Sequence, residues 1–374
     1  MTVQSKRTLK IEKLAQIYDD EIAPVWGARF GKMLLRNLSV PQKGQVLDIS
    51  CGTGYPTIEI LRRMSEGSRL IAIDASSAML DVARRKVADM GPLGKRGVFF
   101  RTESAVPKLS FADEVYDLVV CNLGLGEMPS VEVALRDFAR VAKTGGEVRC
   151  TLPLAGSFEE FHDLYREVLI KHDRHEAQGR LEQHIARYPS AEHVERCMQA
   201  ANLEGGLEYE EFSLLFKSSR EFFYAPVIEY GPLADWKDIA GSGQEMQDVF
   251  WYIKEAIDAY FDGRPFQITV KAGCLIGRKH EPRPVLAPSR SPAGSSIAWP
   301  APPPQAEDTT LPFEPAAPEL PAPPVKIAAG SYRVSEDSGR IEELADFELE
   351  EDAPVEQALD AFIEGKKRPS HLGG

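Results

Sequence analysis

Acidic side chains and glycines occur together where a buried strand is expected to end. Residues 46–55 read Val-Leu-Asp-Ile-Ser-Cys-Gly-Thr-Gly-Tyr, so an apolar strand carrying Asp48 runs into a turn with Gly52 and Gly54. Glycines there let the backbone approach a ligand closely at the start of a helix. Asp74 follows at the end of the next expected strand, where a carboxylate can accept hydrogen bonds from both hydroxyls of a ribose. These features together predict a nucleoside site at the carboxyl edge of a sheet.

Two kinds of nucleoside cofactor, a dinucleotide and S-adenosylmethionine, are compared with this pattern. A dinucleotide site requires Gly-x-Gly-x-x-Gly or Ala, whereas Thr57 stands at the third position here. A dinucleotide site also has no particular need of Asp48. S-adenosylmethionine (SAM) lacks a pyrophosphate but carries an ammonium group, which an acidic side chain can bind. We therefore expect SAM as the cofactor, with an NAD-dependent oxidoreductase as the alternative.

The stretch from Leu47 to Pro153 resembles the class I, Rossmann-like SAM-dependent methyltransferases. The resemblance is to the small-molecule branch, which includes quinone C-methyltransferases and carboxyl O-methyltransferases. It rests on the loop 48–54, in which Ser50 replaces the first glycine, on Asp74, and on the segment 109–122. It implies a methyltransferase that uses SAM. The cofactor-binding residues that it implies, together with neighbours of uncertain alignment after the third strand, are Asp48, Ser50, Gly52, Gly54, Asp74, Ala75, Met79, Glu103, Ser104 and Asn122.

Further candidates lie outside this motif. Glu127 follows the fourth expected strand, where many members of the family carry histidine, and is the nearest candidate for a general base. Its alternative is a solvated loop carboxylate. His172 and His175 have helical spacing, but no third ligand is apparent, so we expect no metal. Four aromatic residues are candidates for the substrate site or its lid, with core packing as the alternative: Tyr18, Trp26, Phe223 and Trp251.

Strands and helices alternate through the first 280 residues, which indicates an α/β fold with a doubly wound, seven-stranded, mostly parallel sheet. N-terminal helices are expected at 5–21 and 27–38, and a helical insert at 218–262. The expected strands are 45–50, 69–73, 97–101, 116–121, 146–152, 207–216 and 266–277. The other expected helices are 56–65, 77–89, 130–143, 158–177 and 190–202.

The composition changes at about residue 280. Residues 281–330 contain 14 prolines, which predicts an extended, disordered linker rich in Pro and Ala. Beyond it the chain is acidic, with apolar spacing that predicts a short amphipathic helix at 354–365. We expect a methyltransferase domain at 1–280, with a cofactor half at 40–155 and substrate or lid elements at 1–38 and 156–265, followed by the linker at 281–335 and the acidic tail at 336–374.

Charge and composition exclude several classes of function. The net charge is −13, of which −9 lies in residues 281–374, so no basic surface for nucleic acid is expected. No run approaches the roughly 20 apolar residues of a membrane span, and the charged N-terminus lacks the apolar run of a signal peptide. Five scattered cysteines argue against a disulfide framework. We therefore expect a cytoplasmic protein.

The sequence gives only one indication of the methyl acceptor. The aromatic content of 218–262 favours a small, hydrophobic molecule. Methyl transfer to such an acceptor is the function we expect. The alternative is a degenerate SAM-binding scaffold that acts through a protein partner of its acidic tail.

Overall fold

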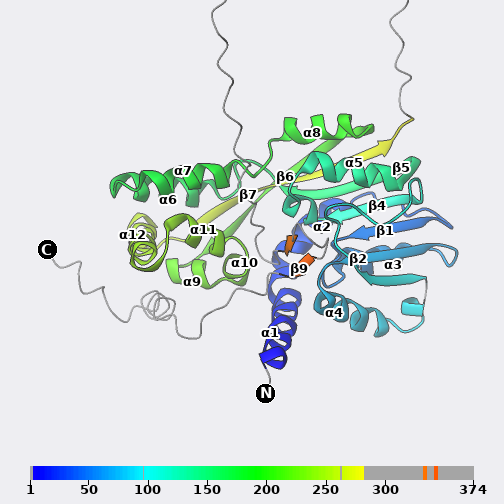
Figure 1. The fold of residues 1–374 in the computed structure, drawn as a ribbon, viewed down its shortest axis with the longest axis horizontal. Coiled ribbons are helices and arrows are strands. Elements are labelled where there is room, and N and C mark those ends of the chain that lie inside the picture. The colour runs from blue at the N-terminus through cyan, green and yellow to red at the C-terminus, as the bar shows by residue number, and fades with distance from the viewer. Residues whose placement is uncertain (1–2, 96, 262, 282–331, 335–340, 344–374) are drawn as a thin grey trace, which may run out of the picture. The chain divides into compact units, whose positions relative to one another are not determined.

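The computed structural model describes residues 3–95, 97–261, 263–281, 332–334 and 341–343. A seven-stranded sheet runs through the part up to residue 281, in the order β3-β2-β1-β4-β5-β7-β6 (Figure 1). Strands β1 to β5 are parallel, and β7 is antiparallel to both of its neighbours. The strands are β1 (Gln45–Ile49), β2 (Arg69–Asp74), β3 (Val98–Thr102), β4 (Tyr116–Asn122), β5 (Ala142–Pro153), β6 (Leu203–Phe216) and β7 (Phe266–Lys279). The α/β fold class with a mostly parallel, seven-stranded sheet is confirmed.

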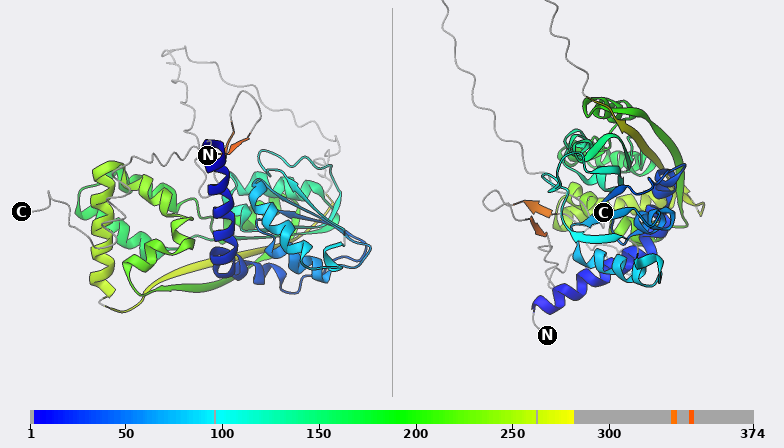
Figure 2. Two further views of the ribbon diagram at one scale, coloured as in Figure 1. Left: turned by 90° about the horizontal axis from the view of Figure 1, so that it is seen from below. Right: turned by 90° about the vertical axis from the view of Figure 1, so that its right-hand side faces the viewer.

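Helices cover both faces of this sheet (Figure 2). The strand order reverses between β1 and β4, and the carboxyl ends of parallel strands beside such a switch are where ligands bind in doubly wound folds. The helices are α1 (Val3–Ile17), η1 (Tyr18–Gly27), α2 (Ala28–Leu35), α3 (Tyr55–Arg63), α4 (Ser77–Ala88), η2 (Leu93–Lys95), η3 (Gly124–Glu127), α5 (Val131–Val141), α6 (Glu159–Lys171), α7 (His175–Ile185), α8 (Ala191–Ala200), α9 (Ser219–Tyr224), α10 (Pro226–Glu229), α11 (Leu233–Ala240) and α12 (Gly243–Phe261).

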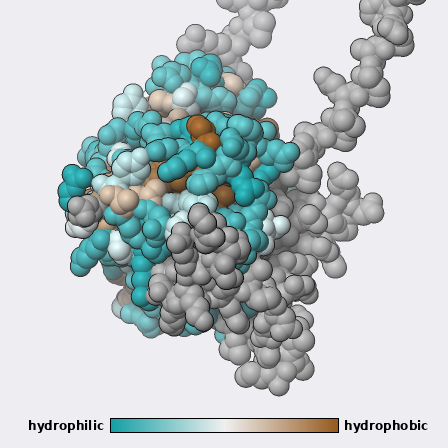
Figure 3. Space-filling model, turned by 90° about the vertical axis from the view of Figure 1, so that its left-hand side faces the viewer, coloured by the Kyte–Doolittle hydropathy of each residue, from teal (hydrophilic) through white to brown (hydrophobic). Residues whose placement is uncertain are grey.

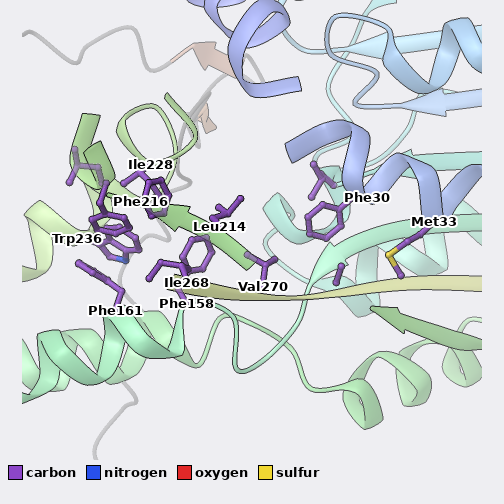
Figure 4. Packing of buried hydrophobic residues seen from close by; sticks show 14 of the residues in the cluster. Phe30, Met33, Phe158, Phe161, Leu214, Phe216, Ile228, Trp236, Ile268 and Val270 are labelled. Atoms are coloured by element: carbon purple, nitrogen blue, oxygen red, sulfur yellow. The ribbon is translucent and has the colours of Figure 1, made fainter. Parts of the chain in front are cut away.

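Two large hydrophobic clusters form most of the core of the described residues, one on each face of the sheet. Successive residues of a strand point to opposite faces, so Val46 joins one cluster and Leu47 the other. The first cluster continues from the sheet into an aromatic group among the helices α6, α9, α11 and α12, part of which is drawn in Figure 4. The second packs α5 and α8 against the sheet. On the face shown in Figure 3, hydrophilic side chains surround a small central group of hydrophobic ones.

Several element boundaries differ from the expected ones. The first expected helix is interrupted, because Tyr18–Gly27 is a π-helix that contains Pro24. The helix expected at 158–177 is divided in two around Asp173, whose φ of 54° is left-handed. Strand β6 begins at Leu203 because it pairs with β7 along its whole length. The helical insert at 218–262 is present as four helices, α9 to α12.

The region after residue 281 was expected to hold a linker and an acidic tail. Most of it, including the helix expected at 354–365, lies outside the described residues. Within it, β8 (Tyr332–Val334) and β9 (Ile341–Glu343) form an antiparallel pair that the sequence analysis did not predict. Among the helices that the structure describes, none has the length and apolar character needed to cross a membrane.

Candidate active site

The loop after β1 and the end of β2 are joined by hydrogen bonds. The backbone N–H of Gly52 donates to Asp74 Oδ2 at 2.8 Å, and that of Cys51 donates to the carbonyl of Ile73 at 3.0 Å. The other oxygen of Asp74 accepts from the N–H of Ser76 at 2.9 Å. The structure therefore brings Asp74 and the glycine loop together at the carboxyl edge of the sheet, where the sequence analysis expected a nucleoside.

The backbone of this loop requires residues that tolerate positive φ. Gly54 has φ 88°, and a Cβ there would come within 3.0 Å of Ala83 Cβ on α4. Ser50 has φ 55° although it is not glycine. Its side chain lies against Gly124, where a Cβ would come within 2.5 Å of Ser50 Cβ. The glycine missing at position 50 is thus matched by a glycine on the opposite loop, which makes room for the serine.

Asp48 is fully buried beneath the loop. Its Oδ2 accepts a hydrogen bond from Thr57 Oγ1 at 2.5 Å, whereas Oδ1 has no hydrogen-bond partner among the described residues. Burial raises the pKa of Asp48 to about 7, and the charge of Asp74 adds to this shift while the Thr57 hydroxyl opposes it. Thr57, the residue that departs from the dinucleotide pattern, thus binds the carboxyl group of Asp48. A cation placed near Oδ1 would stabilise the ionised form.

Tyr18, which lines a pocket beside this loop, lies near Asp74 and Glu127, and this part of the sheet edge is called the cofactor recess below. Tyr18 and Asp74 are half-buried, whereas Glu127 has an exposed side chain around which many protein atoms lie. Burial raises the pKa of Glu127 to about 8, and the negative charge of Asp74 adds to the shift. Burial also raises the pKa of Tyr18, with further contributions from Glu127 and Asp74. The recess therefore brings together acidic groups whose ionised forms a cationic ligand would stabilise.

The π-helix η1 forms one wall of the recess. Asp19 pairs with Lys86 of α4 at 2.6 Å, and Asn122 Nδ2 donates to the carbonyl of Gly27 at 3.1 Å. Asn122 is itself held by Thr151, whose hydroxyl donates to Asn122 Oδ1 at 2.8 Å. A small pocket, partly open to solvent, lies between η1 and the loop. It is lined by Tyr18, Ala23, Gly27, Ser50, Cys51, Thr53, Tyr55, Pro56 and Asn122.

Four expected cofactor residues lie farther along this edge. Ala75 follows Asp74 directly, and Met79 packs with α1 in a small cluster that includes Ala15. Glu103 pairs with Arg101 at 2.9 Å and accepts the N–H of Ser110. Ser104 accepts the N–H of Val106 at 3.0 Å, so its hydroxyl stabilises its own loop. The assignment of these four residues to the cofactor stays a prediction.

The aromatic candidates for a lid are dispersed. The Trp26 ring lies 6.0 Å from that of Phe158, next to Gly27 of the pocket wall. Phe223 is 1% exposed within the aromatic core, and Trp251 contacts Tyr252. Neither Phe223 nor Trp251 lines the pocket described above, so their role at the acceptor stays a prediction.

Three parts of the site were not predicted from the sequence. The hydroxyl of Thr57 was not assigned to Asp48, although a third-position residue in the first helical turn is suitably placed to reach back to the strand. Gly124 could have been noticed as the counterpart of Ser50. The Asp19–Lys86 pair joins residues far apart in the chain and leaves no local signal.

The residues present fit SAM. The unpartnered oxygen of Asp48 and the raised pKa values of Asp48 and Glu127 indicate carboxyl groups that would be stabilised by positive charge. SAM is such a ligand, because it carries a sulfonium and an ammonium group. Among the described residues, no group of three or more His, Cys, Asp or Glu side chains could hold a metal ion.

The region that contains this site is similar to parts of known proteins. Residues 46–146 match the family of methyltransferase domains. A demethylmenaquinone methyltransferase of Staphylococcus aureus is 30% identical over 162 residues, which cover 42% of this chain and 62% of the relative. The chain thus matches less than two thirds of that relative's length.

Solved structures also resemble this chain in fold. The YcgJ protein of Bacillus subtilis is 18% identical, with a TM-score of 0.45 over 68% of this chain and 100% of its own. A putative methyltransferase of Bacillus halodurans is 17% identical, with a TM-score of 0.45 over 67% of this chain and 99% of its own. The family match covers β1 to the start of β5, including the glycine loop and Asp74. Residues 46–146 of this chain are thus similar to known methyltransferase domains.

Proposed function

We propose that the protein transfers a methyl group from SAM to a small, hydrophobic acceptor. The observation that carries this proposal is the cofactor recess, in which the carboxyl groups of Asp48, Asp74 and Glu127 lie beside the glycine loop. A sulfonium or ammonium group would stabilise the ionised forms of these carboxyl groups, whereas the phosphates of a dinucleotide would disfavour them. The family match at residues 46–146 supports the same reaction.

Each part of the recess has a proposed task. Asp48, through Oδ1, binds the ammonium group of the cofactor directly or through water. Asp74 accepts hydrogen bonds from the ribose hydroxyls while it holds the N–H of Gly52. The positive φ of Gly52 keeps the backbone open to the ligand. The bound cofactor supplies an activated methyl group, so the protein contributes chiefly proximity, alignment and exclusion of water.

Glu127 is the proposed general base. With its pKa raised to about 8, it can accept a proton from an acceptor hydroxyl near neutral pH, where an ordinary carboxylate is too weak a base. It lies in η3 directly after β4, at the same sheet edge as Asn122. An acceptor without an ionisable hydroxyl would not require it.

Turnover tests the proposal directly. The full chain is incubated with SAM and a series of acceptors, and S-adenosylhomocysteine is measured by mass spectrometry. The series begins with reduced demethylmenaquinone, because the Staphylococcus aureus relative is named for this molecule. We expect turnover on an apolar acceptor that falls at least about tenfold in Glu127→Gln. SAM binding without turnover on any acceptor would instead support a degenerate scaffold.

The cellular setting is part of the proposal. All five cysteines are unpaired and buried, as expected in a reducing compartment such as the cytoplasm. We also propose that the acidic segment 336–374 binds a protein partner, since its charge is concentrated away from the catalytic domain.

A further inference from the structure

A second group of buried polar atoms lies among the helices, outside the cofactor recess. His162 Nε2, both ring nitrogens of His184 and Trp236 Nε1 have no hydrogen-bond partner among the described residues. The three side chains are 2%, 6% and 0% exposed. Buried nitrogen atoms without partners are rare in folded proteins, and each requires an explanation.

These four nitrogen atoms belong to one cluster, drawn from three helices. The ring of His162, on α6, lies 6.0 Å from that of His184 on α7 and 6.2 Å from that of Trp236 on α11. Neighbouring bonds fix the helices: Tyr165 donates to the carbonyl of Trp236 at 2.8 Å, and Arg180 Nη2 donates to that of Ile239 at 2.9 Å. The unpartnered nitrogens therefore lie in a well-anchored part of the fold.

The cluster offers neutral hydrogen-bonding groups. Burial lowers the pKa of His162 to about 3 and that of His184 to about 4, so both rings are uncharged at neutral pH. The nearest acid, Asp235, is 3.7 Å from His184 Nδ1 and is paired with Arg187 at 3.1 Å. A neutral imidazole has one donor and one acceptor, and an indole has one donor. This set suits a neutral hydroxyl or carbonyl group rather than an ion.

A row of aromatic rings in contact with one another connects the cluster to the cofactor recess. The centroid of the Phe158 ring lies 6.3 Å from that of His162, 5.8 Å from that of Trp236 and 6.0 Å from that of Trp26. Figure 4 shows Phe158 next to Trp236 and Ile268 in the same core region. Trp26 is followed by Gly27, which lines the pocket beside the glycine loop. An elongated apolar molecule bound alongside these rings would have one end near the cofactor and the other at the cluster.

We propose that His162, His184 and Trp236 bind the hydroxyl or carbonyl group of the methyl acceptor, while Trp26 and Phe158 contact its apolar body. This inference rests on the proposed function and narrows the acceptor to an apolar molecule with a neutral polar end.

Two probes of similar size test the proposal: 1-naphthol, which carries a hydroxyl, and 1-methylnaphthalene, which does not. Both are titrated into the full chain by calorimetry, and the histidine ring nitrogens are followed by ¹⁵N NMR. We expect 1-naphthol to bind at least about tenfold more tightly, because only the hydroxyl satisfies the buried nitrogens. The ring signals of His162 and His184 should shift, and that of the exposed His280 should not.

Variants separate recognition from folding. His162→Phe and Trp236→Phe keep an aromatic ring but remove the nitrogen, so the melting temperature should hold or rise while the preference for 1-naphthol disappears. His280→Phe is the matched control and should keep the preference. Equal affinity of the two probes for the wild type, or an unchanged preference in both cluster variants, would overturn the proposal and leave a cluster that binds only water.

SAM titration of the same samples keeps the two proposals apart. If the wild type prefers 1-naphthol through His162 but does not bind SAM, the cluster is a binding site and the methyltransferase proposal fails. If SAM binds and turns over while the naphthol preference is absent, the cluster assignment alone is wrong.

Discussion

The cofactor edge and the helical layer of α6, α7, α9, α11 and α12 are built in different ways. At the cofactor edge, polar groups from β1, β2 and β4 meet because parallel strands end together, and Asp74 has a backbone N–H on each oxygen. In the helical layer, aromatic rings hold the helices together, and four nitrogen atoms have no hydrogen-bond partner in the part of the chain that the structure describes. The first region positions its polar groups through backbone geometry. The second positions them through side-chain packing.

We therefore expect the two regions to tolerate change differently. A substitution at the cofactor edge should weaken ligand binding but leave the strands paired. A substitution in the helical layer should remove packing on which the layer itself depends.

Phe161→Ala should have the largest effect on stability. The Phe161 ring is fully buried and lies 4.1 Å from that of Trp236. Truncating such a ring costs about 3–5 kcal/mol of unfolding free energy. Urea denaturation measures this loss. Ile170→Ala, on the exposed side of α6, should cost far less and is the control. Equal losses for both variants would mean that aromatic packing does not hold the layer.

Acid should destabilise the helical layer through its buried histidines. His162 and His184 have pKa values lowered to about 3 and about 4, whereas an unfolded histidine titrates near ~6.5. As the pH falls below ~6.5, the histidines of the unfolded chain become protonated while those of the native state stay neutral. The free energy of unfolding therefore decreases as the pH falls to about 4. Between pH 8 and pH 5 each histidine should account for about 2 kcal/mol.

Denaturation of His162→Phe at both pH values checks this sign and magnitude. The variant should lose less stability on acidification than the wild type, because one buried histidine is gone. His280→Phe, at an exposed position, should behave as the wild type does. A variant with the full wild-type pH dependence would contradict the assignment of these pKa shifts.

SAM affinity should rise with pH at the cofactor edge. Asp48 and Glu127, with pKa values near 7 and 8, are partly protonated at neutral pH, and a cation binds their ionised forms better. From pH 6 to pH 8 we expect a gain of about tenfold, or ~1.4 kcal/mol. Calorimetry at three pH values measures it, and Glu127→Gln should flatten the profile. If the SAM affinity of the wild type did not depend on pH, neither carboxyl group would interact with the charge of the ligand.

Removal of residues 282–374 should have the smallest effect. The elements of both regions lie before residue 282, and the glycine loop and the aromatic layer make their contacts there. A chain that ends at Glu281 should keep its melting temperature and its SAM affinity. Loss of either one on truncation would place the domain boundary elsewhere and would tie the tail to the catalytic domain.

The sequence predicted the two regions unequally. The strands of the cofactor edge and the positions of Asp48, Gly52 and Asp74 followed from apolar runs and local spacing. The division of 158–177 into α6 and α7, and the meeting of His162 with His184, did not. These contacts depend on aromatic packing between segments far apart in the chain, and a single sequence carries no local pattern for them. The π-helix η1 was missed for a related reason, since its neighbours on α4 and β4 determine where it lies.

Calorimetric titration of SAM into the full chain and its Asp74→Ala variant tests the central claim most directly. We predict that the wild type binds one SAM per chain. The variant should remain folded and bind at least about tenfold more weakly, because two ribose hydroxyls lose a charged acceptor worth roughly 1.5–3 kcal/mol per bond. Asp81→Ala, on the exposed surface of α4, removes the same charge elsewhere and should bind SAM as the wild type does. An Asp74→Ala protein that is folded and keeps wild-type SAM affinity would contradict the account.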